Sequence, residues 1–138
     1  MTVVFDTSVV IQAMFWQRST GRRCFVGVAR RRFKLALSAA ILLEYERTAA
    51  ILRTERFREA NPAGMLGWLA RVALYVEPAP LRGRLSRDAK DNVFVATALA
   101  AQATHIITQD RDLLALEKPF GVKIVTPAEF LREFERLF

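Results

Sequence analysis

Four short apolar runs alternate along the chain with longer segments of helical periodicity. They cover residues 3–5, 34–37, 105–108 and 123–126. Runs this short, separated by helical segments, are typical of strands in a parallel sheet. The alternation therefore predicts an α/β protein, a three-layer α/β/α sandwich around a mainly parallel sheet of four or five strands.

The segments between these runs have the spacing of apolar residues that helices require. We expect helices over residues 9–32 (interrupted at Gly21), 39–53, 65–76, 88–103, 111–116 and 128–137. Ser38 stands where an N-cap is expected, and Pro127 suits the first turn of the last helix. No repeat, low-complexity tract or linker divides the chain, so we expect a single domain over residues 1–138.

The charge balance favours a nucleic-acid partner. Lys and Arg number 21 against 14 Asp and Glu, which gives a formal net charge of +7, and most of the cations are arginines. The planar guanidinium group pairs bidentately with phosphate. A GC-rich coding sequence would produce the same arginine bias, and the run Arg30–Arg32 can be either a solvated face or a set of phosphate contacts.

Other totals bear on location and assembly. The single cysteine excludes an intramolecular disulfide. No signal-sequence pattern is visible, and no apolar run approaches the roughly 20 residues of a membrane span. We therefore expect a cytoplasmic protein without a membrane segment. The hydrophobic fraction of 52% supplies a full core and also suits buried surface in an oligomer.

The aspartates occupy one kind of position. All five follow a predicted strand or open a predicted helix: Asp6, Asp88, Asp91, Asp110 and Asp112. In a parallel sheet these positions share one rim, the rim at which ligands bind.

Helix capping is the simpler explanation for several of these residues. Asp88 can be an N-cap with Asp91 as the third helical residue, and either Asp110 or Asp112 can cap the short helix. Capping explains Asp6 poorly, because Thr7 and Ser8 already offer caps at that helix.

A metal site is the alternative explanation for the carboxylates. Crowded carboxylates repel one another, and Mg²⁺ or Mn²⁺, which prefer oxygen ligands, would neutralise them. A bound ion of this kind can activate water for attack on a phosphodiester. A further acid can come from the helix at 39–53, where Glu44 and Glu46 lie on opposite edges of the apolar face, and periodicity does not choose between them.

Four stretches together resemble the PIN-domain ribonucleases. They are "VFDTSVV", "LLEYER", "DAKDNVFVATALAAQATHIITQDRDLL" and "IVTPAEFL", and they follow the family's order over nearly the whole chain. The long third stretch is the most specific. Within the family, the sequence is most similar to the VapC-like toxin components of bacterial toxin–antitoxin pairs.

The resemblance implies roles for particular residues. The four catalytic acids would be Asp6, Glu44, Asp91 and Asp110. Asp6, Asp91 and Asp110 would be the metal ligands, and supporting roles would fall to Thr108, Asp112 and Asp88. Many members have proline where this chain has Ala89. Basic residues beside Asp91 are candidates for RNA contact: Arg84, Arg87 and Lys90.

The function implied by the resemblance is a Mg²⁺- or Mn²⁺-dependent endoribonuclease. The resemblance also implies a cognate antitoxin protein as a partner and assembly of the chain into a homodimer. The alternative is a nucleic-acid-binding PIN module without significant catalysis, which a Mn²⁺ binding titration would distinguish from the enzyme. The lone His105 is expected at the surface or at a strand edge, and not as a metal ligand.

Overall fold

The computed structural model describes residues 1–56, 63–81 and 92–137. Its elements follow one another as β1 (Thr2–Phe5), α1 (Thr7–Phe15), α2 (Thr20–Ala29), β2 (Lys34–Leu37), α3 (Ala39–Glu55), α4 (Ala63–Val72), β3 (Leu74–Tyr75), α5 (Asn92–Ala100), β4 (His105–Ile107), α6 (Arg111–Leu114), η2 (Pro119–Gly121), β5 (Lys123–Val125), α7 (Pro127–Glu133) and η3 (Glu135–Leu137).

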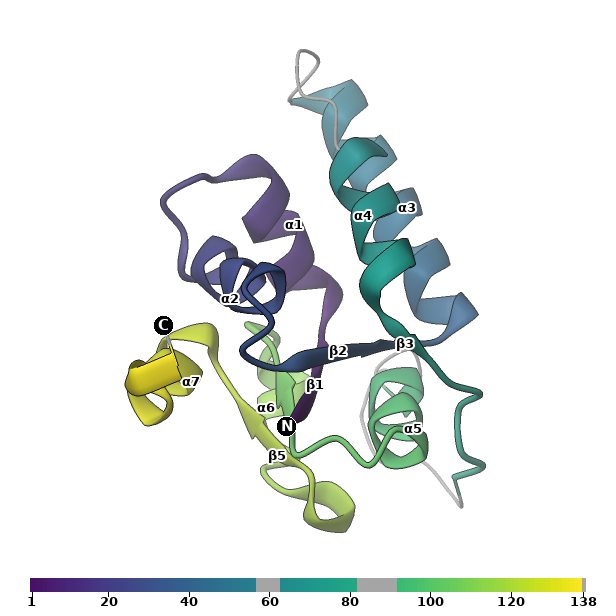
Figure 1. The fold of residues 1–138 in the computed structure, drawn as a ribbon. Coiled ribbons are helices and arrows are strands. Elements are labelled where there is room, and N and C mark those ends of the chain that lie inside the picture. Colours follow the sequence, from purple (N-terminus) through teal and green to yellow (C-terminus); the bar gives the residue numbers. More distant parts are fainter. Residues whose placement is uncertain (57–62, 82–91, 138) are drawn as a thin grey trace.

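The strands form one parallel sheet of five strands in the order β3-β2-β1-β4-β5. The chain builds the sheet outward from β1 to β3, then returns to the other side of β1 for β4 and β5. Right-handed crossovers place helices before and after such a reversal on opposite faces. Figure 1 shows α1 and α2 on one side of the sheet and α5 on the other. The predicted three-layer α/β/α sandwich is confirmed.

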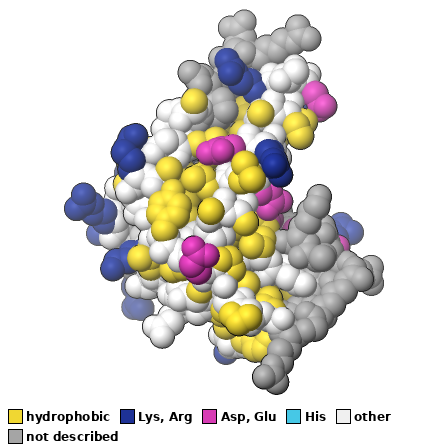
Figure 2. Space-filling model, turned by 90° about the vertical axis from the view of Figure 1, so that its right-hand side faces the viewer, with side chains coloured by type: hydrophobic (Ala, Val, Ile, Leu, Met, Phe, Trp, Pro, Cys, Tyr) yellow, Lys and Arg dark blue, Asp and Glu magenta, His cyan; other side chains and the backbone are white. Residues whose placement is uncertain are grey.

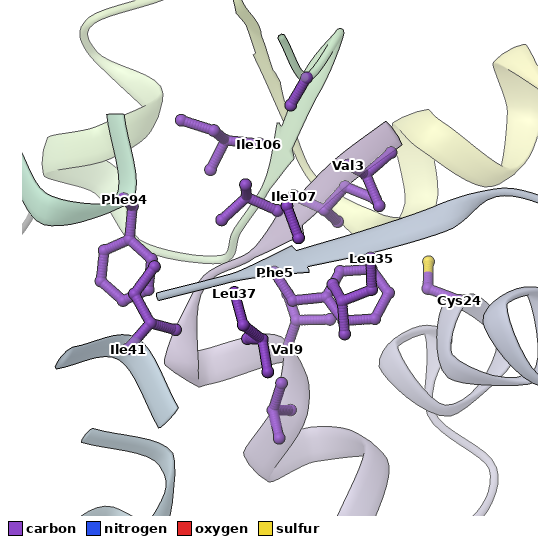
Figure 3. Packing of buried hydrophobic residues seen from close by; sticks show 14 of the residues in the cluster. Val3, Phe5, Val9, Cys24, Leu35, Leu37, Ile41, Phe94, Ile106 and Ile107 are labelled. Atoms are coloured by element: carbon purple, nitrogen blue, oxygen red, sulfur yellow. The ribbon is translucent and has the colours of Figure 1, made fainter. Parts of the chain in front are cut away.

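The centre of the sheet is also the centre of the core. The apolar side chains of β1, β2 and β4 are buried and pack against α1, α3 and α5 (Figure 3). In α5, five consecutive residues, Phe94–Ala98, are buried, as expected of a helix that is apolar on most sides. The described part of this helix covers residues 92–100 of the range 88–103 expected from sequence.

The expectation of one helical segment over residues 9–32 interrupted at Gly21 is wrong. Two helices occupy it, and α2 begins after Ser19, whose Oγ accepts a hydrogen bond from the Arg22 N–H. Gly21 lies in the first turn of α2, where an added Cβ would stand 2.8 Å from the Val9 carbonyl oxygen. The glycine is therefore required by the close approach of α1 and α2.

Two other boundaries differ from the sequence-based expectation. The helix expected over 65–76 ends at Val72, and Leu74–Tyr75 form the edge strand β3. The last helix, expected over 128–137, is α7 followed by the 3₁₀ turn η3. Both segments keep an apolar pattern that continues the preceding helix, so local periodicity does not mark the change. None of the described helices is long and apolar enough to cross a membrane.

Candidate functional site

Strands β1 and β4 are neighbours, and the order of the sheet reverses between them. The crevice outside the carboxyl ends of two such strands is where open α/β sheets bind ligands. Asp6 directly follows β1, and its backbone N–H donates to the Ile107 carbonyl at the end of β4. Asp110 follows β4 and begins α6. The fold therefore brings the first and fourth predicted acids to this crevice.

The Asp6 side chain is held by two hydroxyl groups. It is only 6% exposed, and its Oδ2 accepts hydrogen bonds from Ser8 Oγ and Thr108 Oγ1, each at 2.7 Å. Each hydroxyl in turn accepts a backbone N–H, from Gln109 at 3.1 Å and from Asp110 at 2.8 Å respectively. Two relays thus run from the loop after β4 to one oxygen of Asp6.

The electrostatics of Asp6 favour a bound cation. Burial raises the pKa of this carboxyl, the hydrogen bonds from Ser8 and Thr108 oppose that rise, and the nearby Asp110 carboxylate adds to it. The two hydroxyl groups both donate to Oδ2, and the Ser8 backbone N–H also acts on the carboxyl and lowers its pKa. A positive ion beside this carboxylate would offset the cost of burying the charge.

Capping does not account for Asp6. It occupies the N-cap position of α1 without a regular side-chain cap, and the Ser8 backbone N–H contributes less to its pKa than the two hydroxyl groups do. The expectation that Thr7 or Ser8 caps this helix is wrong as well. Ser8 donates to Asp6, and the buried Thr7 Oγ1 has no hydrogen-bond partner among the described residues.

Asp110, and not Asp112, caps α6. Oδ1 of Asp110 accepts the backbone N–H groups of Asp112 at 2.7 Å and Leu113 at 3.4 Å. Its Oδ2 receives no hydrogen bond from the described residues. At Asp110, as at Asp6, the hydrogen bonds shown converge on one carboxylate oxygen, so the other can bind a ligand. Capping and ligand binding are compatible at this residue.

The structure distinguishes the two glutamates of α3. Glu44 is half-buried and Glu46 is exposed. Between them Tyr45 is fully buried, and its hydroxyl donates to the Phe5 carbonyl just before Asp6. Burial raises the pKa of Tyr45 well above its usual value, and the Asp6 and Glu44 carboxylates raise it further. Glu44 is thus the half-buried acid of the two, and it adjoins the tyrosine that bonds to the residue before Asp6.

Several predicted residues lie outside the described part of the chain. They are Arg84, Arg87, Asp88, Lys90 and Asp91. Within residues 1–56, 63–81 and 92–137, no three His, Cys, Asp or Glu side chains gather closely enough to hold a metal ion. The described acids Asp6, Glu44 and Asp110 come from three elements and supply hard oxygen donors, the type that Mg²⁺ and Mn²⁺ prefer.

Sequence reasoning missed two residues that support the site. The sequence offers Ser8 only as a helix cap, and it assigns Tyr45 no role at the site. The only local sign of the role of Ser8 is its position, since its hydroxyl stands two residues after a buried aspartate. Nothing local indicates that Tyr45 reaches β1, because the two segments are 40 positions apart.

Comparison with known proteins identifies the fold. A family model described as PIN domain matches residues 2–112. The chain belongs to the PIN-domain family. Members are generally nucleases, and the family generally uses divalent metal ions.

A solved structure shares the PIN fold of this chain. It is VapBC2 from Rickettsia felis bound to a DNA fragment from its promoter, with a TM-score of 0.57 and 10% identity, and the match covers 90% of this chain and 97% of that one. Nothing matches among the curated proteins. At this identity the likeness concerns the fold.

Proposed function

We propose that this PIN domain is a Mg²⁺- or Mn²⁺-dependent endoribonuclease and the toxin of a toxin–antitoxin pair. The observation that carries the proposal is the state of Asp6. Its carboxylate is buried at the reversal point of the sheet, and both hydroxyl donors, Ser8 and Thr108, bond to the same oxygen, Oδ2. A purely structural carboxylate in that position would be expected to have both oxygens satisfied.

The residues at the crevice suit a metal-assisted hydrolysis. Asp6 and Asp110 each keep one oxygen for a ligand, and we propose that Asp91 completes the set. Bound Mg²⁺ or Mn²⁺ would supply an activated water and offset the charge of the scissile phosphate. Ser8 and Thr108 hold Asp6 in one orientation, so that little reorganisation is needed when substrate binds.

Glu44 is the candidate for positioning the attacking water. It is half-buried on α3, and it shares with Asp6 the electrostatic influence on Tyr45. Asp112, in the first turn of α6, and Asp88 would support the acids without binding the ion. Arg84, Arg87 and Lys90 would contact the RNA strand beside Asp91.

The assignment of RNA and of partners rests on charge, exposure and the fold neighbour. The net charge of +7 suits a polyanionic substrate. On the face in Figure 2, acidic side chains lie among hydrophobic ones. Large apolar side chains on α3 and β3, Leu43, Ile51 and Tyr75, are between 44% and 56% exposed, which suits a covered surface. Since the neighbour is a VapBC2 complex, we propose an antitoxin and a second copy of this chain as partners, in the cytoplasm.

The decisive test is the substitution Asp6→Asn, which keeps the shape and removes the charge. We expect cleavage of a mixed RNA substrate with Mn²⁺ to fall by orders of magnitude, because the ion and its water depend on this carboxylate. The fold should survive. In EDTA the variant should melt at a higher temperature than the wild type at neutral pH, since the raised pKa of Asp6 means that ionisation opposes folding there.

Controls separate this proposal from its alternative, a PIN module that binds nucleic acid without cutting it. Wild type should lose cleavage in EDTA and bind Mn²⁺ in a titration, and Asp6→Asn should bind Mn²⁺ more weakly. Wild-type cleavage in EDTA, or unchanged cleavage by Asp6→Asn, would show that the metal-nuclease proposal is wrong. Nucleic-acid binding with neither Mn²⁺ binding nor cleavage would favour the alternative.

A further inference from the structure

A cavity lies at the opposite end of the sheet from Asp6. It has a volume of about 680 Å³ and is lined by the end of α2, the start of β2 and one side of α4. Its apolar wall includes Val28, Trp68 and Val72. A cavity of this size falls within the range of small-ligand sites. The length of β1 separates it from the carboxylates, so it is distinct from the proposed active site.

The rim of this cavity is basic. Arg31, Arg32 and Lys34 line it and are exposed, whereas no Asp or Glu from residues 1–56, 63–81 or 92–137 does so. Within the described part of the chain, none of these three side chains has an ion pair or a hydrogen bond. Three unpaired cations beside an apolar wall form a site for a ligand that has both an anionic part and an apolar part.

The backbone at Arg31 adds an independent observation. Arg31 has φ of 57°, in the left-handed region that favours glycine. It closes α2 through hydrogen bonds from Arg31 N–H to the Val28 carbonyl and from Arg32 N–H to the Gly27 carbonyl, each 2.9 Å. Glycine is the usual residue at this position of a helix end. An arginine here forgoes that preference and places a guanidinium group at the cavity.

Trp68 offers a flat surface beside these cations. Its indole is partly exposed, and its ring centroid lies 5.2 Å from that of the buried Phe25. Packing against Phe25 holds the indole in place. Stacking of a nucleobase on an aromatic ring, with arginines on the phosphates, is how proteins bind nucleotides without reading the sequence.

We infer that this cavity binds a nucleoside phosphate, with its phosphates on Arg31, Arg32 and Lys34 and its base on Trp68. The ligand is either a free nucleotide or one unit of an RNA strand, since the two present the same chemistry. The inference goes beyond the proposed nuclease function, because this site holds no carboxylate, needs no metal ion and performs no reaction. An acidic peptide fits less well, because it offers no base-like ring to the indole.

The test is isothermal titration calorimetry of the full chain in EDTA at about 50 mM salt, where phosphate contacts are strong. The probes are ADP, an oligoadenylate of about ten nucleotides, pyrophosphate and a polyglutamate peptide. Saturable ADP binding supports a free-nucleotide site, and binding of the oligoadenylate alone supports an RNA unit. Three results would each overturn the inference. In the first, neither ADP nor the oligoadenylate binds. In the second, pyrophosphate binds as tightly as ADP, and in the third, polyglutamate binds more tightly than both ADP and the oligoadenylate.

The variant Arg31→Gly makes the test specific. It should weaken binding of the bound probe by about tenfold or more, the usual range for loss of a charge-assisted contact. Its melting temperature should stay the same or rise, because glycine is relaxed at this φ. Arg132→Gln, an equal loss of charge on the exposed side of α7, should bind like the wild type. Binding by Arg31→Gly that equals the wild type would overturn the inference.

The measurement is independent of the nuclease proposal. It uses no metal and no cleavage, and Asp6→Asn should bind the probes as the wild type does. If the wild type binds ADP but never cuts RNA, only the nuclease proposal fails. If it cuts RNA but does not bind either nucleotide probe in EDTA, only this inference fails.

Discussion

Asp6 follows β1 at the carboxyl end of the sheet, whereas His105 begins β4 at the amino end, and both side chains are buried. Two hydroxyl groups donate to Asp6 Oδ2. His105 contacts the rings of Phe130 and Phe134, at 5.4 and 5.2 Å between centroids. Polar neighbours that orient a charge surround the first group, and aromatic rings that exclude water surround the second.

The contacts of His105 suit a neutral ring. Its Nδ1 lies 2.8 Å from Thr104 Oγ1, and its Nε2 lies 3.6 Å from Glu133 Oε1, too far for a hydrogen bond. Burial lowers the pKa of His105, while Glu133 opposes the shift and Lys123 adds to it. The expectation that His105 lies at the surface or at a strand edge is therefore wrong, because β4 is an inner strand and the ring belongs to the core.

The different surroundings of Asp6 and His105 indicate different roles for these two buried ionisable groups. The hydrogen bonds from Ser8 and Thr108 offset part of the cost of burying the Asp6 charge. Because both bond to Oδ2, the other oxygen, Oδ1, can bind a ligand. Beside His105 Nε2 the only charged acceptor among the described residues is Glu133, 3.6 Å away, and its effect on the pKa is smaller than that of burial, so the main contribution of the ring is packing. We expect substitutions at the carboxyl end to change activity and substitutions at the amino end to change stability.

The largest expected effect beyond Asp6 itself is at Glu44. Glu44→Gln should lower RNA cleavage at least about a hundredfold, within the range for loss of a residue that activates or orients the reacting group. Glu46→Gln is the matched control: it removes the same charge two residues away on the same helix, from an exposed side chain. Its cleavage should stay within about twofold of the wild type. Steady-state cleavage with Mn²⁺ measures both, and equal losses would contradict the role of Glu44.

An intermediate effect distinguishes the two threonines that flank β4. Thr108→Val removes the donor to Asp6 and the acceptor for the Asp110 N–H, so it should cost about 1–3 kcal/mol of stability and also lower cleavage. Thr104→Val is the control at the other end, where the side chain is exposed and water can replace its bonds. Denaturant melts should show a smaller loss for Thr104→Val, with cleavage unchanged. The comparison between the two ends fails if the two variants lose stability and activity alike.

The smallest effect is a pH dependence from His105, which is the chain's single histidine. Its pKa is lowered from the usual 6.5. The contribution of the neutral ring to stability is therefore present above about pH 6.5 and lost as the pH falls through the lower folded-state pKa. NMR of the ring protons should give that pKa directly. His105→Phe should flatten this part of the stability profile, and a ring pKa at or above 6.5 would contradict the prediction.

Particular residues show how far sequence reasoning reached into the fold. The runs at residues 3–5 and 34–37 became β1 and β2 as expected, because short apolar runs between helical patterns indicate buried strands. Ser38 caps α3 by accepting from Ile41 N–H, and Thr126 caps the helix that begins at Pro127. Leu74–Tyr75 was missed, because a strand of two residues is defined by pairing with β2 and has no periodicity of its own.

At the site, the sequence predicted where the acids lie along the chain, but not which groups they form hydrogen bonds with. The positions of Asp6 and Asp110 after strands predicted a shared rim, and the structure places both at the reversal between β1 and β4. The choice between Glu44 and Glu46 needed their different burial, since both edges of an apolar face look alike in sequence. Which aspartate caps α6 depended on two backbone N–H groups converging on Asp110.

The sequence by itself determined the alternation of strands and helices, the excess of positive charge and the acids that follow the strands. These are local properties, set by side-chain type and spacing within a few residues. Only the tertiary structure decided that Thr108, 102 positions from Asp6, holds one oxygen of that carboxylate, and that the ring of His105 enters the core. Such outcomes depend on which strands become neighbours in the sheet, because burial and hydrogen-bond partners are fixed when distant segments close around them.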